Sequence, residues 1–105
     1  RDRPDCIRAS GGATRSDVWM QIAADALQTP IEIPGGSELG ALGAAICAAV
    51  AVGAYPDYPS ACSAMVRIVR TFGPDPQQAD AYRAKYDRYR RLLTALQPAW
   101  QDLKN

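Results

Sequence analysis

The stretch SGGATRSDVWMQ, Ser10 to Gln21, joins a short apolar run to the start of an amphipathic segment. Two adjacent glycines, Gly11 and Gly12, stand directly before the first helical residues. Glycine permits a tight turn, and because it has no Cβ it also lets a ligand approach the backbone closely. Taken alone, the two glycines fit a simple turn as well as a phosphate-contacting loop.

The residues after the glycines predict an amphipathic helix that ends at Thr29-Pro30. Ser16 or Thr14 can cap its N-terminus, and Asp17 places a negative charge in the first turn, where the helix dipole favours it. Apolar residues recur at helical spacing. The expected buried face consists of Val18, Trp19, Ile22, Ala23, Ala26 and Leu27.

The rest of the chain alternates short strands with helices. Strands are expected over 6–10, 30–34 and 66–72, and helices over 38–54, 58–65 and from 79 to about 98. In 66–72 apolar residues alternate with Arg, which is typical of a strand with one solvated face. The order strand, helix, strand, helix predicts an α/β layer arrangement.

The last helix has a continuous apolar stripe and many basic residues, and it is expected to end near Pro98. The basic residues fit RNA binding, a partner helix or a solvated face, and Asp80 and Asp87 favour the solvated face because they interrupt the positive charge. The stripe consists of Ala79, Tyr82, Tyr86, Tyr89, Leu93 and Leu96.

The segment LGALGAAICAAVAVGAY, Leu39 to Tyr55, is uncharged and dominated by small residues. It is somewhat short for a membrane span of about 20 residues, so we expect a helix sandwiched between other elements instead. Ser37 is expected to cap this helix, with Glu38 in its first turn, and Cys47 is expected to be buried within it.

Composition excludes several classes of function. The 105 residues have a net charge of +1, which predicts no nucleic-acid or membrane partner, and they include no His, which removes the commonest general base and metal ligand. Three widely spaced cysteines predict reduced thiols in a cytoplasmic protein and neither a disulfide framework nor a metal site. The N-terminal RDRPDCIR lacks the apolar core of a signal peptide, and its abrupt start leads us to expect a piece of a longer protein.

Four segments, in order, resemble the C-terminal end of the FGGY family of carbohydrate kinases. The resemblance runs from Ala9 to about Ala99, and its order makes it more specific than any one motif. The segments are ASGGATRSDVWMQIAADAL, PIEIP, ELGALGAAICAAVAVGAY and FGPDPQQADAYRAKYDRYRRLLTAL.

The resemblance implies that residues 1–105 are the C-terminal portion of the second actin-like (ribonuclease H-like) domain, on the nucleotide-binding side. In such kinases ATP binds between two domains, and a catalytic Asp from an earlier part of the chain activates a sugar hydroxyl for attack on the γ-phosphate, with Mg²⁺ neutralising the phosphate oxygens. That Asp and the N-terminal sugar-binding domain are absent from these residues. We therefore expect this chain alone to be inactive, and we assign it no catalytic residue and no metal ligand.

The resemblance also implies a cofactor-binding set. Gly11, Gly12 and Ala13 match the family turn that passes the nucleotide phosphates and ribose, and Ser16 matches a polar position that contacts the nucleotide. The physical chemistry agrees, because a glycine-rich strand-to-helix turn directs backbone N–H groups towards an anion. Arg15 stands beside the turn and can reach a phosphate or remain simply exposed.

Two further helix residues follow the family pattern. Asp25 can brace a loop or pair with an Arg, and both readings remain open. Trp19 matches a core aromatic residue, and we expect a structural role for it.

The function implied is that of an ATP-dependent sugar or polyol kinase, with ATP and a carbohydrate as its partners and a homodimer as a further expectation. The GGATRS turn with Trp-Met-Gln looks closer to pentulose and polyol kinases, of the xylulokinase or erythritol kinase type, than to glycerol kinase. The alternative is a non-enzymatic α/β or helical interaction module that uses the Tyr-rich last helix. Such a module has no need of the Gly11-Gly12 turn.

Overall fold

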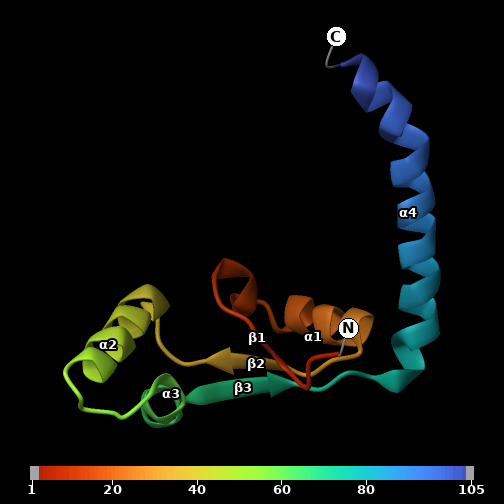
Figure 1. The fold of residues 1–105 in the computed structure, drawn as a ribbon. Helices are drawn as coiled ribbons and strands as arrows, with labels where there is room; N and C mark the ends of the chain where they lie inside the picture. The colour runs from red at the N-terminus through yellow and green to blue at the C-terminus, as the bar shows by residue number, and fades with distance from the viewer. Residues whose placement is uncertain (1–2, 104–105) are drawn as a thin grey trace.

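The computed structural model describes residues 3–103. Figure 1 shows a small sheet with α1 beside it, α2 and α3 at one end, and α4 leaving the other end as a long arm. This order of strands and helices confirms the expected α/β class. The elements are β1 (Ile7–Arg8), the 3-10 helix η1 (Gly12–Arg15), α1 (Asp17–Leu27), β2 (Ile31–Pro34), α2 (Leu39–Ala51), α3 (Tyr58–Met65), β3 (Ile68–Phe72), the 3-10 helix η2 (Pro76–Gln78) and α4 (Ala79–Asp102).

The sheet has the strand order β1-β2-β3. β1 and β2 are parallel, with Ile7 opposite Ile31, whereas β2 and β3 are antiparallel, with Ile31 opposite Phe72. Parallel neighbours require a crossover connection, and η1 with α1 supplies it. The turn that contains Gly11 therefore lies at the carboxyl end of β1, where ligands commonly bind in open α/β sheets.

The core lies between α1 and the sheet. Met20 and Ala24 of α1 pack against Ile31 and Ile33 of β2, and all four are buried. Residues partly buried around them are Ile7, Ala9, Ala13, Ala23 and Phe72.

The expected buried face of α1 was wrong except at Ala23, which is partly buried against the core. Val18 and Trp19 are 71% and 60% exposed, and Ile22 and Leu27 are also exposed. α1 is apolar on two sides, and the sheet covers only the side of Met20 and Ala24. Because nothing within residues 3–103 covers Val18 and Trp19, Trp19 is not a core residue of this chain.

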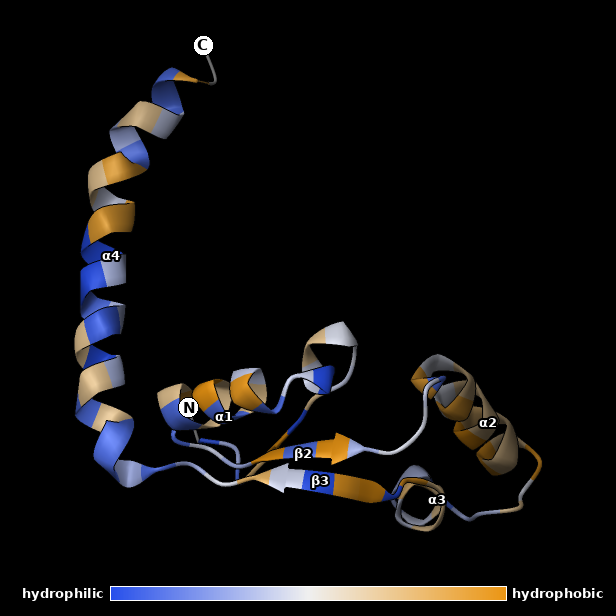
Figure 2. Ribbon diagram, turned by 180° about the vertical axis from the view of Figure 1, so that it is seen from behind, coloured by the Kyte–Doolittle hydropathy of each residue, from blue (hydrophilic) through white to orange (hydrophobic). Residues whose placement is uncertain are grey.

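α2 is nearly uncovered, contrary to the expected sandwich. Within the described part of the chain it buries only Ile46 and packs mainly against α3. Cys47 is exposed and not buried as expected. Figure 2 shows the largely apolar α2 lying beyond the end of the sheet. The reason is that a helix with small residues on every side needs several neighbours, and residues 3–103 provide one.

The N-termini of α2 and α3 differ in capping. Ser37 does not cap α2, whose N-cap residue is Glu38 with no side-chain hydrogen bond. Asp57 caps α3, accepting a hydrogen bond of 2.8 Å from the Ser60 backbone N–H. Hydrogen bonds from the side chain and backbone of Ser60 stabilise the ionised carboxylate and lower the pKa of Asp57.

β3 shows the predicted alternation but not the predicted placement of its arginine. Ile68, Arg70 and Phe72 are half-buried, whereas Val69 and Thr71 are exposed. Arg70 therefore shares the half-buried face with Ile68 and Phe72 and does not lie on the more exposed face of Val69 and Thr71.

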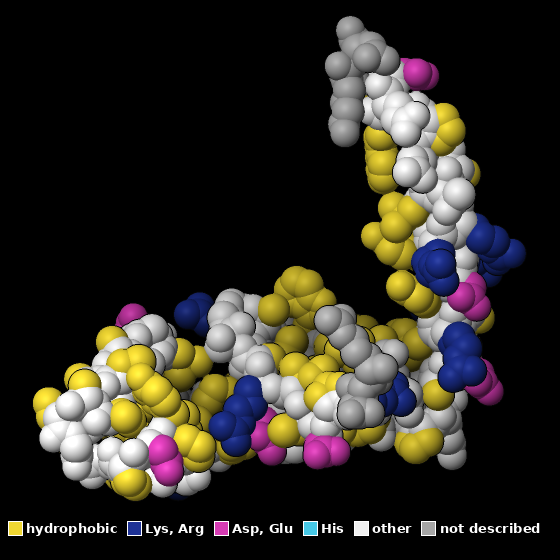
Figure 3. All heavy atoms as spheres, viewed as in Figure 1, with side chains coloured by type: hydrophobic (Ala, Val, Ile, Leu, Met, Phe, Trp, Pro, Cys, Tyr) yellow, Lys and Arg dark blue, Asp and Glu magenta, His cyan; other side chains and the backbone are white. Residues whose placement is uncertain are grey.

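α4 contacts the body only near its N-terminal end, and none of its described residues is buried. Figure 3 shows hydrophobic side chains along the part of the arm that stands clear of the body. The helix continues through Pro98 to Asp102 and does not end at the proline. Proline removes one backbone donor, and an exposed helix can continue for a further turn without it. None of the helices within residues 3–103 has both the length and the apolar character needed to cross a membrane.

Candidate functional site

A groove of about 680 Å³ opens at the carboxyl ends of β1 and β2. Gly11 and Gly12 line it where β1 runs into η1, and Gly35 and Gly36 line it where β2 runs into α2. Two strand ends with glycine pairs therefore face one space. Most of the wall near these glycines is backbone.

Two arginines line the groove, one of which, Arg70, is paired with the carboxylate of Asp17. Arg15 and Arg70 are among its lining residues, and no Asp or Glu of the described chain is. Ser10, Thr14 and Ser37 add hydroxyl groups. Such a wall suits an anion, because arginine donates several hydrogen bonds in a fixed geometry and backbone N–H groups add donors.

The backbone and its surroundings favour glycine at three positions of the groove. Gly11 and Gly36 have φ values of +99° and +110°, a region that other residues rarely adopt. A Cβ at Gly35 would lie 2.7 Å from Cγ1 of Val69, so a side chain there would have to displace Val69. Gly12 is under neither constraint, since its φ is not positive and a Cβ there would meet no atom within 4 Å. A side chain at position 12 would therefore reach into open space and not into the fold.

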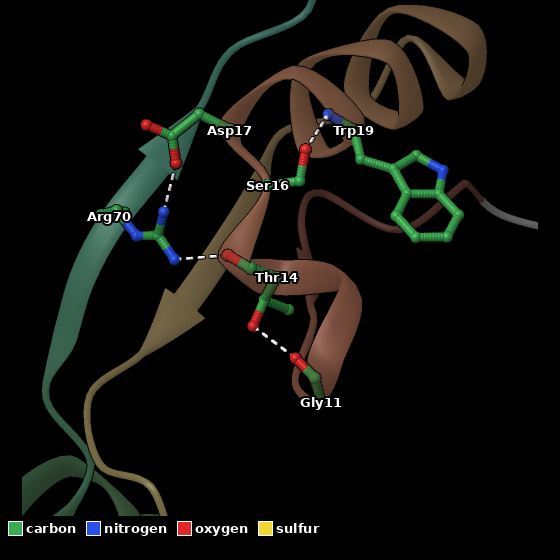
Figure 4. A network of polar contacts seen from close by, with 6 residues as sticks. All are labelled: Gly11, Thr14, Ser16, Asp17, Trp19 and Arg70. Atoms are coloured by element: carbon green, nitrogen blue, oxygen red, sulfur yellow. Dashed lines mark hydrogen bonds and ion pairs between the residues drawn. The ribbon is translucent and has the colours of Figure 1, made fainter.

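Thr14 closes the turn through hydrogen bonds to Gly11. Its backbone N–H and its hydroxyl both donate to the Gly11 carbonyl, at 3.1 Å and 2.7 Å. Figure 4 shows this contact together with Arg70, whose guanidinium donates to the Thr14 carbonyl and to the carboxylate of Asp17. The turn is thus held from within and from β3.

The four residues expected to bind the cofactor divide into two pairs. Gly11 and Gly12 line the groove. Ala13 packs against the core, and Ser16 caps α1, with its hydroxyl accepting a hydrogen bond of 3.2 Å from the Trp19 N–H. Ser16 and not Thr14 is therefore the cap. A contact between any of the four and a nucleotide stays a prediction.

Several lining residues were not singled out from the sequence. Gly35, Gly36 and Ser37 line the groove, although the sequence predicted only a cap at Ser37. A second Gly-Gly pair after a second strand was a usable signal. Arg70 could not be found this way, because its place at the groove depends on the pairing of β3 with β2.

Asp25 braces a loop, which confirms one of its two readings. The carboxylate is buried, and its Oδ1 accepts from the Asp75 N–H and from Nε2 of Gln21, both at 2.8 Å. These bonds hold the segment that leads into η2 and α4. Asp25 lies outside the groove and makes no ion pair with an Arg in the described chain.

Comparison with known proteins agrees with this α/β segment. Residues 1–52 match the model of the FGGY family of carbohydrate kinases, C-terminal domain. The L-xylulose/3-keto-L-gulonate kinase of Escherichia coli (strain K12) is 42% identical over 91 residues, which are 87% of this chain and 18% of that kinase. The erythritol kinase of Brucella abortus (strain 2308) is 34% identical over 104 residues, 97% of this chain and 20% of that kinase.

Solved structures show the same relationship. The xylulose kinase from Rhodospirillum rubrum superposes with a TM-score of 0.80 at 36% identity, over 93% of this chain and 20% of that chain. The fold is thus that of one segment of these carbohydrate kinases. The chain belongs to the FGGY family, as the resemblance of its four segments implied, and it spans about a fifth of the length of these relatives.

Proposed function

We propose that residues 1–105 form the nucleotide-binding C-terminal portion of the second actin-like domain of an ATP-dependent sugar or polyol kinase. The observation that supports this most directly is the groove. It lies at the carboxyl ends of parallel strands, has glycine pairs on two sides, and includes two arginines and no carboxylate. A glycine-rich turn at the carboxyl end of a parallel strand is a common binding site for nucleotide phosphates.

In this proposal the chain binds and orients ATP, which when bound supplies the phosphoryl group that is transferred. The open backbone at Gly12 allows close approach of the phosphates or ribose, Arg15 offsets negative charge, and Ser16 holds the start of α1. The groove does not fit Mg²⁺, because its lining includes no carboxylate ligand. The ligands of Mg²⁺, the catalytic Asp and the sugar contacts would come from the rest of the kinase, so we expect the chain alone to be inactive.

The acceptor is proposed only as a class. Relatives of this chain include an L-xylulose/3-keto-L-gulonate kinase, an erythritol kinase and a glycerol kinase, the last 40% identical over 96 residues. Because these relatives are named for different acceptors, the proposal names a sugar or polyol and no single compound. We further propose a cytoplasmic enzyme, since ATP is its phosphoryl donor.

Substitution of Gly12 by valine in the full-length kinase that contains this segment tests the proposal. The new side chain has room in the fold and projects where a ligand would pass. We expect the KM for ATP to rise tenfold or more, equivalent to about 1.4 kcal/mol of lost binding, with much less change in the KM for the sugar. Steady-state kinetics with each substrate varied in turn measures both.

Gly73→Val is the matched control, because a Cβ there also meets no atom within 4 Å and Gly73 does not line the groove. It should leave the KM for ATP unchanged. If Gly12→Val instead unfolded the protein and left ATP affinity intact in the folded fraction, the glycines would be a turn only.

Ser16→Ala separates a cap from a ligand contact. Loss of one hydrogen bond or one cap costs roughly 0.5–1.5 kcal/mol. Because Ser16 caps α1, we expect a lower melting temperature without ATP. If Ser16 also contacts the nucleotide, the stabilisation that ATP adds falls as well, which thermal melts at several ATP concentrations would detect.

A further inference from the structure

We infer that Arg70 is a positioning residue for the Gly11-Gly12 turn and thereby sets the affinity of the groove for ATP. This inference rests on the proposed function. It concerns a residue beyond the region 1–52 that the family model matches. It also joins β3 to a site that otherwise consists of the ends of β1 and β2.

Arg70 holds the turn from a distant part of the chain. One guanidinium nitrogen donates to the Thr14 carbonyl, 56 positions away, and the other to the Asp17 carboxylate, 53 positions away (Figure 4). The guanidinium also lies over the ring of Phe72, 5.8 Å from its centroid. Because the planar group bonds two acceptors at once, it fixes the end of η1 and the start of α1 relative to the sheet.

Thr14 connects Arg70 to Gly11, because it is hydrogen bonded to both residues. Thr14 is buried, and it donates two hydrogen bonds to the Gly11 carbonyl. Glycine has many accessible conformations, so a turn built on Gly11 and Gly12 has a large ordering cost when a ligand binds. A turn that is already held by Thr14 and Arg70 avoids part of that cost.

A purely structural ion pair is the competing explanation, and the chain offers a matched control for it. Arg8 and Glu32 form a second ion pair, with 3.1 Å between Nε and Oε2, across the paired strands β1 and β2. Arg8 does not line the groove and makes no described bond to the turn. Arg70 lines the groove and is hydrogen bonded to Thr14 in the turn. Only the loss of Arg70 should therefore change the affinity for the nucleotide.

The test compares Arg70→Met with Arg8→Met in the full-length kinase that contains this segment. We expect Arg70→Met to raise the KM for ATP about tenfold, since a charged hydrogen bond to the turn is lost. The KM for the sugar and kcat should change less than about twofold, because the reacting groups are untouched. Arg8→Met should lower the melting temperature without changing the KM for ATP.

Arg70→Lys decides the question if Arg70→Met does not fold. Lysine keeps the charge but cannot satisfy both acceptors in the same geometry, so the KM for ATP should rise about threefold. Equal KM values for ATP in the wild type and in folded Arg70 variants would overturn this inference alone. A wild-type kinase that binds no ATP would overturn the proposed function and this inference with it.

Discussion

At the scale of single residues, the carboxylate of Asp25 joins segments that lie 50 positions apart. Gln28 reinforces the same junction, with Nε2 donating to the carbonyls of Asp25 and Asp75 at 2.7 Å and 2.9 Å. The loop before α4 is therefore held by side chains of α1 and of Gln28, the residue directly after it. Its position depends on a buried acceptor that must remain paired.

Asp25→Ala should lower the free energy of unfolding by about 1–3 kcal/mol, because the Asp75 N–H and the Gln21 amide lose their buried acceptor. Urea denaturation of the full-length kinase containing this segment measures the change. Asp25→Asn retains an acceptor oxygen and should have a smaller effect. Equal midpoints for the alanine variant and the wild type would show that water replaces the carboxylate.

At the scale of elements, α2 has the composition of a tightly packed helix, but most of its surface is exposed in the described chain. A Cβ at Gly40 or Gly43 would meet no atom within 4 Å, although Gly43 lines a small apolar groove with Leu42 and Ile46. We expect the rest of the kinase to cover this surface, because an uncharged helix that is apolar on every side is typical of a buried position.

Gly43→Leu distinguishes a covered α2 from an open one. In the full-length kinase we expect the free energy of unfolding to fall by about 1–3 kcal/mol, which is the usual cost of overpacking a core. The leucine side chain would overpack a close contact of the helix. Chemical denaturation provides the measurement. An unchanged midpoint would mean that this face of α2 is solvated in the intact enzyme too.

At the scale of the whole molecule, the chain is much more extended than a compact domain of its size. Its Cα radius of gyration is 19.0 Å, whereas about 13 Å is typical for roughly 100 residues. Large apolar side chains remain exposed on α1 and along α4, among them Trp19, Tyr86 and Trp100. Hydrophobic burial is therefore small relative to the entropy of ordering the chain.

The isolated 105-residue chain should consequently self-associate or be only marginally stable. Sedimentation velocity would show species larger than a monomer, and calorimetry would show a weak or absent unfolding transition. Trp19→Ser and Trp100→Ser should each reduce the association, because each removes exposed apolar area. A monomeric chain with one sharp cooperative transition would contradict this prediction.

The sequence by itself determined the order of the main strands and helices and the family, and it narrowed the cap of α1 to Ser16 or Thr14. Those features depend on local chemistry: Gly and Pro positions, apolar periodicity and the preference of a hydroxyl for a helix N-terminus. Element boundaries were predicted to within a few residues, with α2 shorter and α4 longer than expected.

Only the tertiary structure decided which residues of these elements meet. α1 has two apolar sides, and periodicity cannot tell which one a sheet will cover, so Trp19 was misplaced and Met20 was missed. The groove likewise combines the ends of β1 and β2 with Arg70 of β3, residues brought together by strand pairing across a long stretch of chain. Local pattern specifies an element, whereas the face it buries depends on neighbours that are distant in sequence.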